Sequence, residues 1–383
     1  MPSVTSNHDP KYHLWGLIGI KNGAQSSADL RECIMKANDD FVRHFRLMIR
    51  DSPMQKVGEL IALELEQMGY IIRDPNGYRL TEKGMTLSCA LENDSSSWNA
   101  VIEDFMPTML STFEEMRIFV RKILQFENGT FIPKVPAVTE VFGSSQSYDQ
   151  TSYLQQCKTY ISSHWNWNFP LKWDEGSLSE KIAYWTREST STKPSDLAKA
   201  IYRDYFLSQY FGGELGDVKY KVIRDRLHYF GLVNYSEHLP QFDGEVMYPL
   251  VWRAPKLPYA RPLVLAGDTL YMSNPTWTEI SKDFLSALWE VHQSSAGVGY
   301  VPVMDLRDKV CLILKISDMS FNNLLKQARI EGQRGNSPIR ILADASDLLG
   351  RETSKKRIPI DFGRESGMGV RTLISLNLCE QKS

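Results

Sequence analysis

The side chains best suited to chemistry lie toward the C-terminal end of the chain, in a segment of helical periodicity that follows Ser317. Phe321, Leu324 and Leu325 share one side of this predicted helix. Amide and cationic side chains occupy the other side, and these types hydrogen-bond base edges in the major groove or contact phosphates. The residues predicted to contact nucleic acid here are Asn322, Asn323, Lys326, Gln327 and Arg329.

Basic residues also dominate the segment after this helix. Positions 326–371 hold ten Lys or Arg and six Asp or Glu, an excess of four positive charges in a chain whose formal net charge is −2. Such a local excess is typical of a phosphate-contacting surface. The alternative is a basic segment that is only solvated. The phosphate-contacting residues predicted in it are Arg340, Lys355, Lys356 and Arg357.

A second basic stripe is predicted nearer the middle of the chain. Lys221, Arg224 and His228 are spaced at three and seven residues, which places them on one face of a helix, while apolar residues occupy another face. We therefore expect the basic face to be exposed and to contact duplex DNA. The alternative is a solvated helix face whose cations pair locally with Asp217 and Asp225.

The helices and strands expected to position these side chains occur in the same order three times along the sequence. In the first copy, a helix over 30–50 precedes a second helix that starts at Ser52-Pro53, since Ser is a favoured N-cap and Pro a favoured first residue. A hairpin turns at 74–77, and Thr81 caps a helix that runs to about residue 91. The second helix of this copy is expected to expose acidic side chains, which disfavour a phosphate backbone. The residues expected on this face are Lys56 and three carboxylates, Glu59, Glu64 and Glu66.

The second and third copies repeat this order of helices and strands. In the second copy, helices are predicted from about 177 to 188, from 193 to 210 and from 217 to 230, followed by two strands that end at 252. The third copy is predicted over about 280–380, with three helices and then strands around a long wing. Residues 92–115 lack Lys and Arg and predict a solvated acidic linker, and the Pro-rich segment 255–275 predicts an extended connection.

Two stretches of sequence resemble known modules. The sequence GYRLTEKG closes the first hairpin into a helix, and residues 30–91 resemble a winged-helix domain, whose wing commonly ends in Leu-Thr-x-x-Gly. The stretches YVPVMDLRDKV and ISDMSFNNLL resemble a helix-turn-helix module met in proteins encoded beside bacterial and archaeal antiviral or restriction systems. We therefore predict a mainly α protein with small β-hairpin wings (α+β), built of three tandem winged-helix-like units. The predicted divisions are 1–91, an acidic helical linker region 92–150, 151–260, and 261–383 with the basic wing.

Other features narrow the class of function. The chain has no phosphate-binding glycine loop and no nucleophile elbow, and its seven histidines never pair at ligand spacing, so we predict no catalytic residue, no metal site, no cofactor and no small-molecule substrate. A nuclease using Glu352 and Lys355 is the enzymatic alternative. Scattered cysteines, a polar N-terminus and the lack of a long apolar run predict a cytoplasmic protein away from the membrane. The aromatic cluster over 165–185 is interpreted as domain packing.

The combined hypothesis is a non-catalytic protein that binds duplex DNA through its second and third units, as a regulator or as a subunit of a prokaryotic defence complex. The first unit is expected to contact a protein partner. The alternative, from a different class, is a scaffold subunit that uses all its winged-helix units for protein contacts and does not bind DNA. Affinity for DNA should fall steeply with salt, whereas scaffold contacts should depend on apolar patches.

Overall fold

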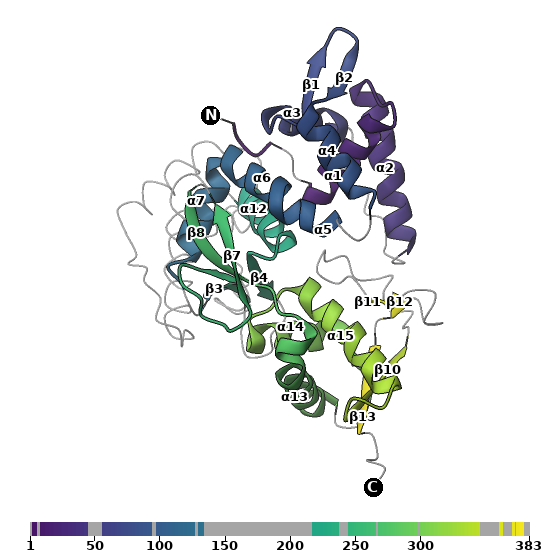
Figure 1. The fold of residues 1–383 in the computed structure, drawn as a ribbon, viewed down its shortest axis with the longest axis vertical. Coiled ribbons are helices and arrows are strands. Elements are labelled where there is room, and N and C mark those ends of the chain that lie inside the picture. The colour runs from purple at the N-terminus through teal and green to yellow at the C-terminus, as the bar shows by residue number, and fades with distance from the viewer. Residues whose placement is uncertain are drawn as a thin grey trace, which may run out of the picture.

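The structure is a computed structural model and has a mixed α+β architecture with small antiparallel sheets of two or three strands. Figure 1 shows the N-terminal helices and their hairpin at the top and the C-terminal helices and sheet at the bottom, with α6 and α12 between them. The described residues are 2–5, 8–44, 56–93, 97–126, 129–133, 217–236, 244–265, 267–296, 299–344, 360–362, 370–371 and 373–378.

The N-terminal elements form as their local signals predict. Thr81 caps α4, since its Oγ1 accepts a hydrogen bond from the Gly84 amide at 3.1 Å. Gly69 ends α3 with a φ of +76°, which favours glycine. The predicted start of α3 at Ser52-Pro53 lies outside the described residues. The elements are α1 (Pro10–Lys21), α2 (Ser27–His44), α3 (Val57–Gln67), β1 (Ile71–Asp74), β2 (Gly77–Leu80) and α4 (Glu82–Leu91).

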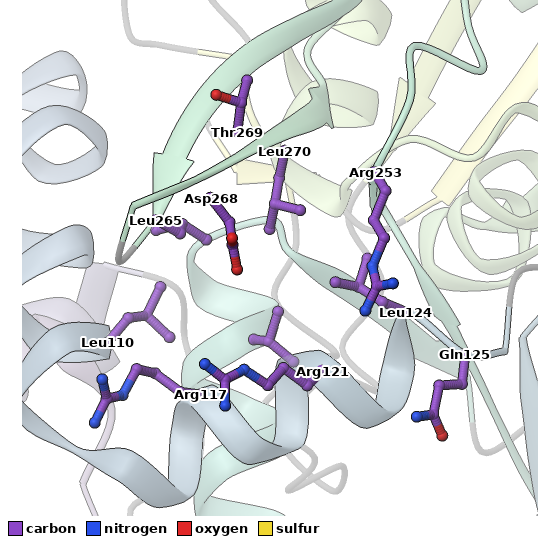
Figure 2. A pocket seen from close by; sticks show the side chains of 11 residues that line it. Leu110, Arg117, Arg121, Leu124, Gln125, Arg253, Leu265, Asp268, Thr269 and Leu270 are labelled. Carbon is purple, nitrogen blue, oxygen red and sulfur yellow. The ribbon is translucent and has the colours of Figure 1, made fainter.

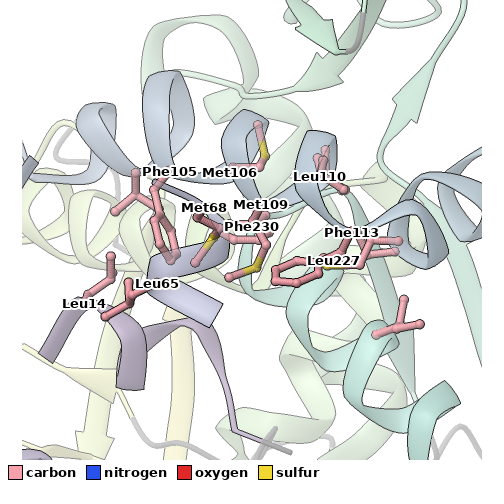
Figure 3. Packing of buried hydrophobic residues seen from close by; sticks show 14 of the residues in the cluster. Leu14, Leu65, Met68, Phe105, Met106, Met109, Leu110, Phe113, Leu227 and Phe230 are labelled. Atoms are coloured by element: carbon pink, nitrogen blue, oxygen red, sulfur yellow. The ribbon is translucent and has the colours of Figure 1, made fainter. Parts of the chain in front are cut away.

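The region predicted to be a solvated linker supplies central helices of the protein where it is described. α6 and the helical turn before it bury Phe105, Met106 and Met109 completely. Figure 3 shows Phe105 close to Leu14 and Leu65, and Met109 beside Phe230. The elements are α5 (Ser97–Ala100), the π-helix η2 (Val101–Phe105), α6 (Met106–Thr112), α7 (Glu114–Ile123) and β3 (Thr130–Pro133).

The middle part of the chain contains one helix and two small sheets in its described range. The third helix and the two strands of the second copy are confirmed, whereas the two preceding helices fall outside the described residues. The segment 255–275 is not an extended connection, because it forms the β7–β8 hairpin. The sheets have strand orders β3-β5-β4 and β6-β8-β7. The elements are α12 (Asp217–Tyr229), β4 (Val233–Ser236), β5 (Gly244–Pro249), β6 (Val251–Trp252), β7 (Ala260–Leu265) and β8 (Asp268–Ser273).

The described C-terminal part contains three helices, a three-stranded antiparallel sheet of order β10-β13-β9 and a two-stranded sheet, β11-β12. The register pairs Ile339 with Leu378 and Ile374 with Val301. Ser317 caps α15 through a hydrogen bond from the Ser320 amide to its Oγ, at 3.0 Å. The elements are α13 (Trp277–Ala296), β9 (Val301–Pro302), α14 (Val303–Leu314), α15 (Asp318–Gln333), β10 (Ile339–Asp344), β11 (Ile360–Asp361), β12 (Val370–Arg371) and β13 (Leu373–Leu378).

Two buried apolar clusters hold these elements together. The first runs from Leu14 to Met272 and joins α1, α3, α6, α7 and α12 to the β7–β8 hairpin. The second lies between Tyr259 and Leu376 and joins α13, α14 and α15 to the C-terminal sheet. The first cluster combines elements from all four predicted divisions, because α6 lies between the N-terminal helices and α12, and the β7–β8 hairpin belongs to the division 261–383.

Candidate nucleic-acid interface

The helix α15 carries five of the predicted nucleic-acid contacts, and the structure separates them by exposure. Asn323 is exposed, whereas Asn322, Lys326 and Gln327 are half-buried. Asn322 Oδ1 accepts a hydrogen bond from Arg307 Nη1 at 3.4 Å, and Gln327 Nε2 donates to a Glu331 carboxylate oxygen at 3.0 Å. Asn323 and Lys326 are therefore the predicted contacts that α15 presents with no hydrogen bond to the described part of the chain.

The prediction that Arg329 contacts nucleic acid is wrong, because only 7% of this residue is exposed. Its guanidinium carbon lies 5.2 Å from the centre of the Phe362 ring. Position 329 is four residues after Leu325 and eight after Phe321, so it belongs to the apolar side of the helix rather than to its polar side. Burial, and then the positive charge of Arg371, lower the pKa of Arg329 below its usual range. Arg329 therefore packs in the C-terminal unit instead of facing solvent.

The prediction that Arg224 is exposed is also wrong. This residue is the central member of the basic stripe predicted on α12. Arg224 is 4% exposed, pairs with Glu245 of β5, and donates to Asp225 Oδ1 at 2.9 Å. Its guanidinium also lies 3.8 Å from the centre of the Tyr235 ring. Burial alone would lower the pKa of Arg224, but the Glu245 carboxylate raises it well above its usual value. The sheet β3-β5-β4 thus covers a helix face that the spacing predicted to be exposed.

The other two residues of this stripe are partly accessible. Lys221 is half-buried, and His228 is half-buried with its Nε2 3.2 Å from Asp318 Oδ2. Asp318 is the first residue of α15. The stripe on α12 therefore turns toward the C-terminal unit at its far end and does not form a continuous basic surface.

Hydrogen bonds from Asn234 and Ser236 of β4 form an interface with α14 and the start of α15, which we call the seam, and this interface limits what α15 can contact. Asn234 Nδ2 donates to the Ile316 carbonyl at 3.2 Å and to Asp318 Oδ1 at 2.9 Å, and Ser236 Oγ donates to Asp308 Oδ2 at 2.5 Å. A helix-turn-helix protein normally inserts the N-terminal residues of its second helix among the base edges. Here β4 and α12 cover that end of α15, so its remaining exposed side must make any contact with DNA.

The exposed side of α15 runs along the whole helix. Its accessible residues mix amide, cationic and apolar types, and Arg340 of β10 is exposed beyond the helix. The predicted phosphate contacts Lys355, Lys356 and Arg357, and the nuclease alternative of Glu352 with Lys355, lie outside the described residues, as does the aromatic cluster over 165–185. The accessible stripe on α15 consists of Met319, Asn323, Lys326, Ile330 and Gln333.

A buried polar cluster that the sequence did not reveal joins the N-terminal helices to α12. Glu64 was predicted to be exposed, but it is fully buried, with its Oε2 2.8 Å from Arg226 Nη2 and 2.6 Å from His13 Nε2. The Thr5 amide donates to Glu64 Oε1 at 2.7 Å. Position 64 is seven residues after Val57, which is a signal for the buried face of α3. The cluster is fully enclosed, so it serves packing rather than ligand binding.

No group of three or more His, Cys, Asp or Glu among the described residues could hold a metal ion. No helix among them has the length and apolar character needed to cross a membrane.

Comparisons of the chain with protein-family models, with curated proteins and with solved structures found no match. Function is therefore inferred from the residues and their geometry.

Proposed function

We propose that the protein binds duplex DNA without catalysing a reaction on it, and that it does so through a winged helix formed by α13 to β13. The contact surface consists of the exposed side of α15, with Asn323 and Lys326, and the neighbouring strand β10, with Arg340. Asn322 and Gln327 lie beside this surface and already have hydrogen-bond partners in the protein. Binding is directed mainly at phosphates and is tolerant of sequence.

The observation that carries the proposal is the order of elements in the C-terminal unit. A helix, a short strand and two helices are followed by β10, the short β11–β12 pair and β13, and the three-stranded sheet has the order β10-β13-β9. This is the order of a winged helix, in which the third helix and the wing between the last two strands face the duplex. α15 holds the position of that third helix, and the predicted phosphate contacts Lys355, Lys356 and Arg357 follow β10 in the sequence, outside the described residues.

The N-terminal and middle units match the winged-helix order less completely than the C-terminal unit does. The N-terminal unit contains three helices, the β1–β2 hairpin and α4 in winged-helix order. Its third helix exposes Glu59, Leu63 and Glu66, so the charges on this face are acidic and suit a protein partner better than DNA. The middle unit contributes α12 with β4 and β5, and of its predicted stripe Lys221 and His228 retain partial exposure. Three tandem winged-helix-like units therefore remain our proposal for the whole chain.

The position of the seam explains why sequence-tolerant binding is proposed. The N-terminal turn of α15 begins with Asp318, which accepts from Asn234 and lies beside His228. A carboxylate at that place would face phosphates or base acceptors unfavourably if the turn entered the groove. Lys326 and Arg340 lie farther along, where a cation can contact the backbone of the duplex.

Fluorescence anisotropy with a labelled duplex of about 20 base pairs tests the proposal. We expect a dissociation constant of about 1–100 μM at physiological salt, the range of sequence-independent binding. A Lys326→Ala/Arg340→Ala variant should bind at least about tenfold more weakly, since each side chain contributes one phosphate contact. The matched control is Arg43→Gln, whose side chain is 74% exposed on α2. Equal affinity of the double variant and the control would refute the assignment.

A scaffold without DNA binding is the second candidate, and one observation favours it. Ile313 of α14 is 54% exposed, and the α15 stripe includes Met319 at 37% and Ile330 at 39% exposure. Met319 and Ile330 lie on the same side of α15, and exposed apolar side chains on one face are typical of protein contacts. A role as a regulator or as a subunit of a prokaryotic defence complex follows from the sequence resemblance alone. If the scaffold hypothesis holds, a partner should dissociate from an Ile330→Ser variant, with little effect of salt.

A further inference from the structure

A pocket of about 550 Å³ lies between α6–α7 and the β7–β8 hairpin, away from the C-terminal unit (Figure 2). Arg117 and Arg121 line it from α7, and Arg253 lines it from the segment after β6. Figure 2 shows Arg253 and Asp268 reaching toward α7 from the opposite side. Leu110 of α6 and Leu270 of β8 contribute to an aliphatic wall. The pocket falls within the volume range of small-molecule sites, about 300–1,000 Å³.

The charges of this pocket are not balanced by the residues that the structure describes. Three guanidinium groups face one carboxylate, and none of the four is within salt-bridge distance of an oppositely charged group in the described part of the chain. Arg117 and Arg121 are four residues apart on α7, where two like charges destabilise a helix. The Nε of Arg117 is buried and has no hydrogen-bond partner among the described residues. A buried donor without a partner costs about 1–3 kcal/mol, so an anion that accepted from it would stabilise the site.

The chemistry of the lining selects the kind of anion. Guanidinium groups present paired N–H donors that match phosphate oxygens, and a phosphate monoester carries close to two negative charges at neutral pH. That charge balances the excess of two positive charges left by three arginines and Asp268. The volume exceeds what a phosphate ion occupies, and the aliphatic wall can pack against the rest of a ligand. Asp268 can accept a hydrogen bond from a ligand hydroxyl.

We propose that this pocket binds a phosphate monoester of about nucleotide size, with the phosphate held by Arg117, Arg121 and Arg253 and the body of the ligand against Leu110 and Leu270. This site is independent of the proposed winged-helix surface. The same phosphate monoester group occurs on a free nucleotide and at the 5′ end of a nucleic-acid strand, and the experiment below separates these two sources.

Isothermal titration calorimetry of the full chain with AMP, ribose 5-phosphate, inorganic phosphate and adenosine tests the proposal. Affinity should rise from inorganic phosphate to ribose 5-phosphate to AMP, and adenosine should not bind. Arg121→Gln and Arg253→Gln should each weaken AMP binding about tenfold or more, because each removes a charge-assisted contact to phosphate. Both side chains are exposed, so these variants should unfold like the parent protein. Arg43→Gln, an exposed arginine on α2, is the matched control and should leave AMP binding unchanged.

A further titration compares AMP with a short single strand that does or does not carry a 5′-phosphate. Tighter binding of AMP assigns the site to a free metabolite, and tighter binding of the phosphorylated strand assigns it to a strand end; both support a phosphate monoester site. No heat of binding with millimolar AMP, equal binding of AMP and adenosine, or AMP affinities that do not change in Arg121→Gln and Arg253→Gln would overturn it.

Discussion

The buried ion pair of Glu64 and Arg226 should make a large and mutually dependent contribution to stability. Both side chains have zero exposure, and the pair joins α3 to α12 across the first apolar cluster. Arg226→Met leaves the Glu64 carboxylate buried without its cation, and Glu64→Leu leaves the guanidinium without its anion. Removing one partner of such a pair costs about 3–5 kcal/mol. Each single variant should therefore lower the free energy of unfolding by about that amount.

The double variant Glu64→Leu/Arg226→Met should be less destabilised than either single variant. It removes both charges, and replacing a buried ion pair by apolar side chains is often close to neutral. The Thr5 amide also donates to Glu64, so a loss of about 1–3 kcal/mol should remain. The assay is urea unfolding followed by circular dichroism. The result that refutes this reasoning is a double variant whose loss equals the sum of the two single losses, to within about 0.5 kcal/mol.

A matched exposed pair provides the control for these measurements. Arg79 Nη2 lies 2.5 Å from Asp74 Oδ2 on the β1–β2 hairpin, and the Arg79 side chain is 64% exposed. Solvent screens such a pair, so Arg79→Met should cost less than about 1 kcal/mol. A loss in Arg79→Met as large as that in Arg226→Met would show that burial is not the source of the effect.

Three further predictions follow from burial and close packing. Burial lowers the pKa of His13 from 6.5, against the opposing effect of its carboxylate partner, so the folded protein should be most stable above pH 6.5. Below that pH, its free energy of unfolding should fall by up to about 1.4 kcal/mol per pH unit. Unfolding measured at several pH values should show a shallower fall in His13→Gln, and an equal fall would contradict this prediction. A Cβ at Gly58 would lie 2.1 Å from a backbone oxygen of α2, so Gly58→Ala should lower the melting temperature. The control is Gly335→Ala, where the space is open and only the φ of +76° opposes the substitution. A smaller shift for Gly58→Ala than for Gly335→Ala would contradict the close contact. Arg329→Ala should reduce stability more than DNA affinity and Arg340→Ala the reverse, which thermal melts and anisotropy measure; the opposite order would contradict their assigned exposures.

Elements with a local physical signal were predictable from the sequence. Thr81 and Ser317 cap helices through the hydrogen bonds that their residue types favour, and Gly69 ends α3 with a positive φ. The β1–β2 hairpin turns where Pro75 and Gly77 indicate, and Gly77 has a φ of +118°. In each case the signal and the structure it determines lie within a few residues of each other.

The candidate site was predictable only in part, because exposure depends on elements distant in the chain. Periodicity identifies one apolar face of a helix, but α12 is covered on a further face by β5, which buries Arg224. Glu64 was also assigned to the exposed side of its helix, although its true partner Arg226 is 162 residues away. A carboxylate and a guanidinium so far apart give no pattern in the sequence that shows they will meet.

The β7–β8 hairpin was missed for a different reason. Its prolines suggested an extended connection, since proline cannot donate a hydrogen bond to a sheet. Pro262 lies in β7, the edge strand of the order β6-β8-β7, and an edge strand tolerates proline. The seam that covers the start of α15 was equally hidden, because Asn234 and Ser236 come from a strand about 80 residues before it.

The most direct test of DNA binding is the dependence of affinity on salt, measured by anisotropy between about 50 and about 200 mM for two duplexes of unrelated sequence. If the stripe on α15, β10 and the wing contact phosphates, log affinity should fall with log salt at a slope of about −3 to −5, and both duplexes should bind alike. In Lys326→Ala/Arg340→Ala the slope should be shallower by about 1.8, since two phosphate contacts are lost. A slope near zero, or an unchanged slope in this variant, would contradict the proposed interface.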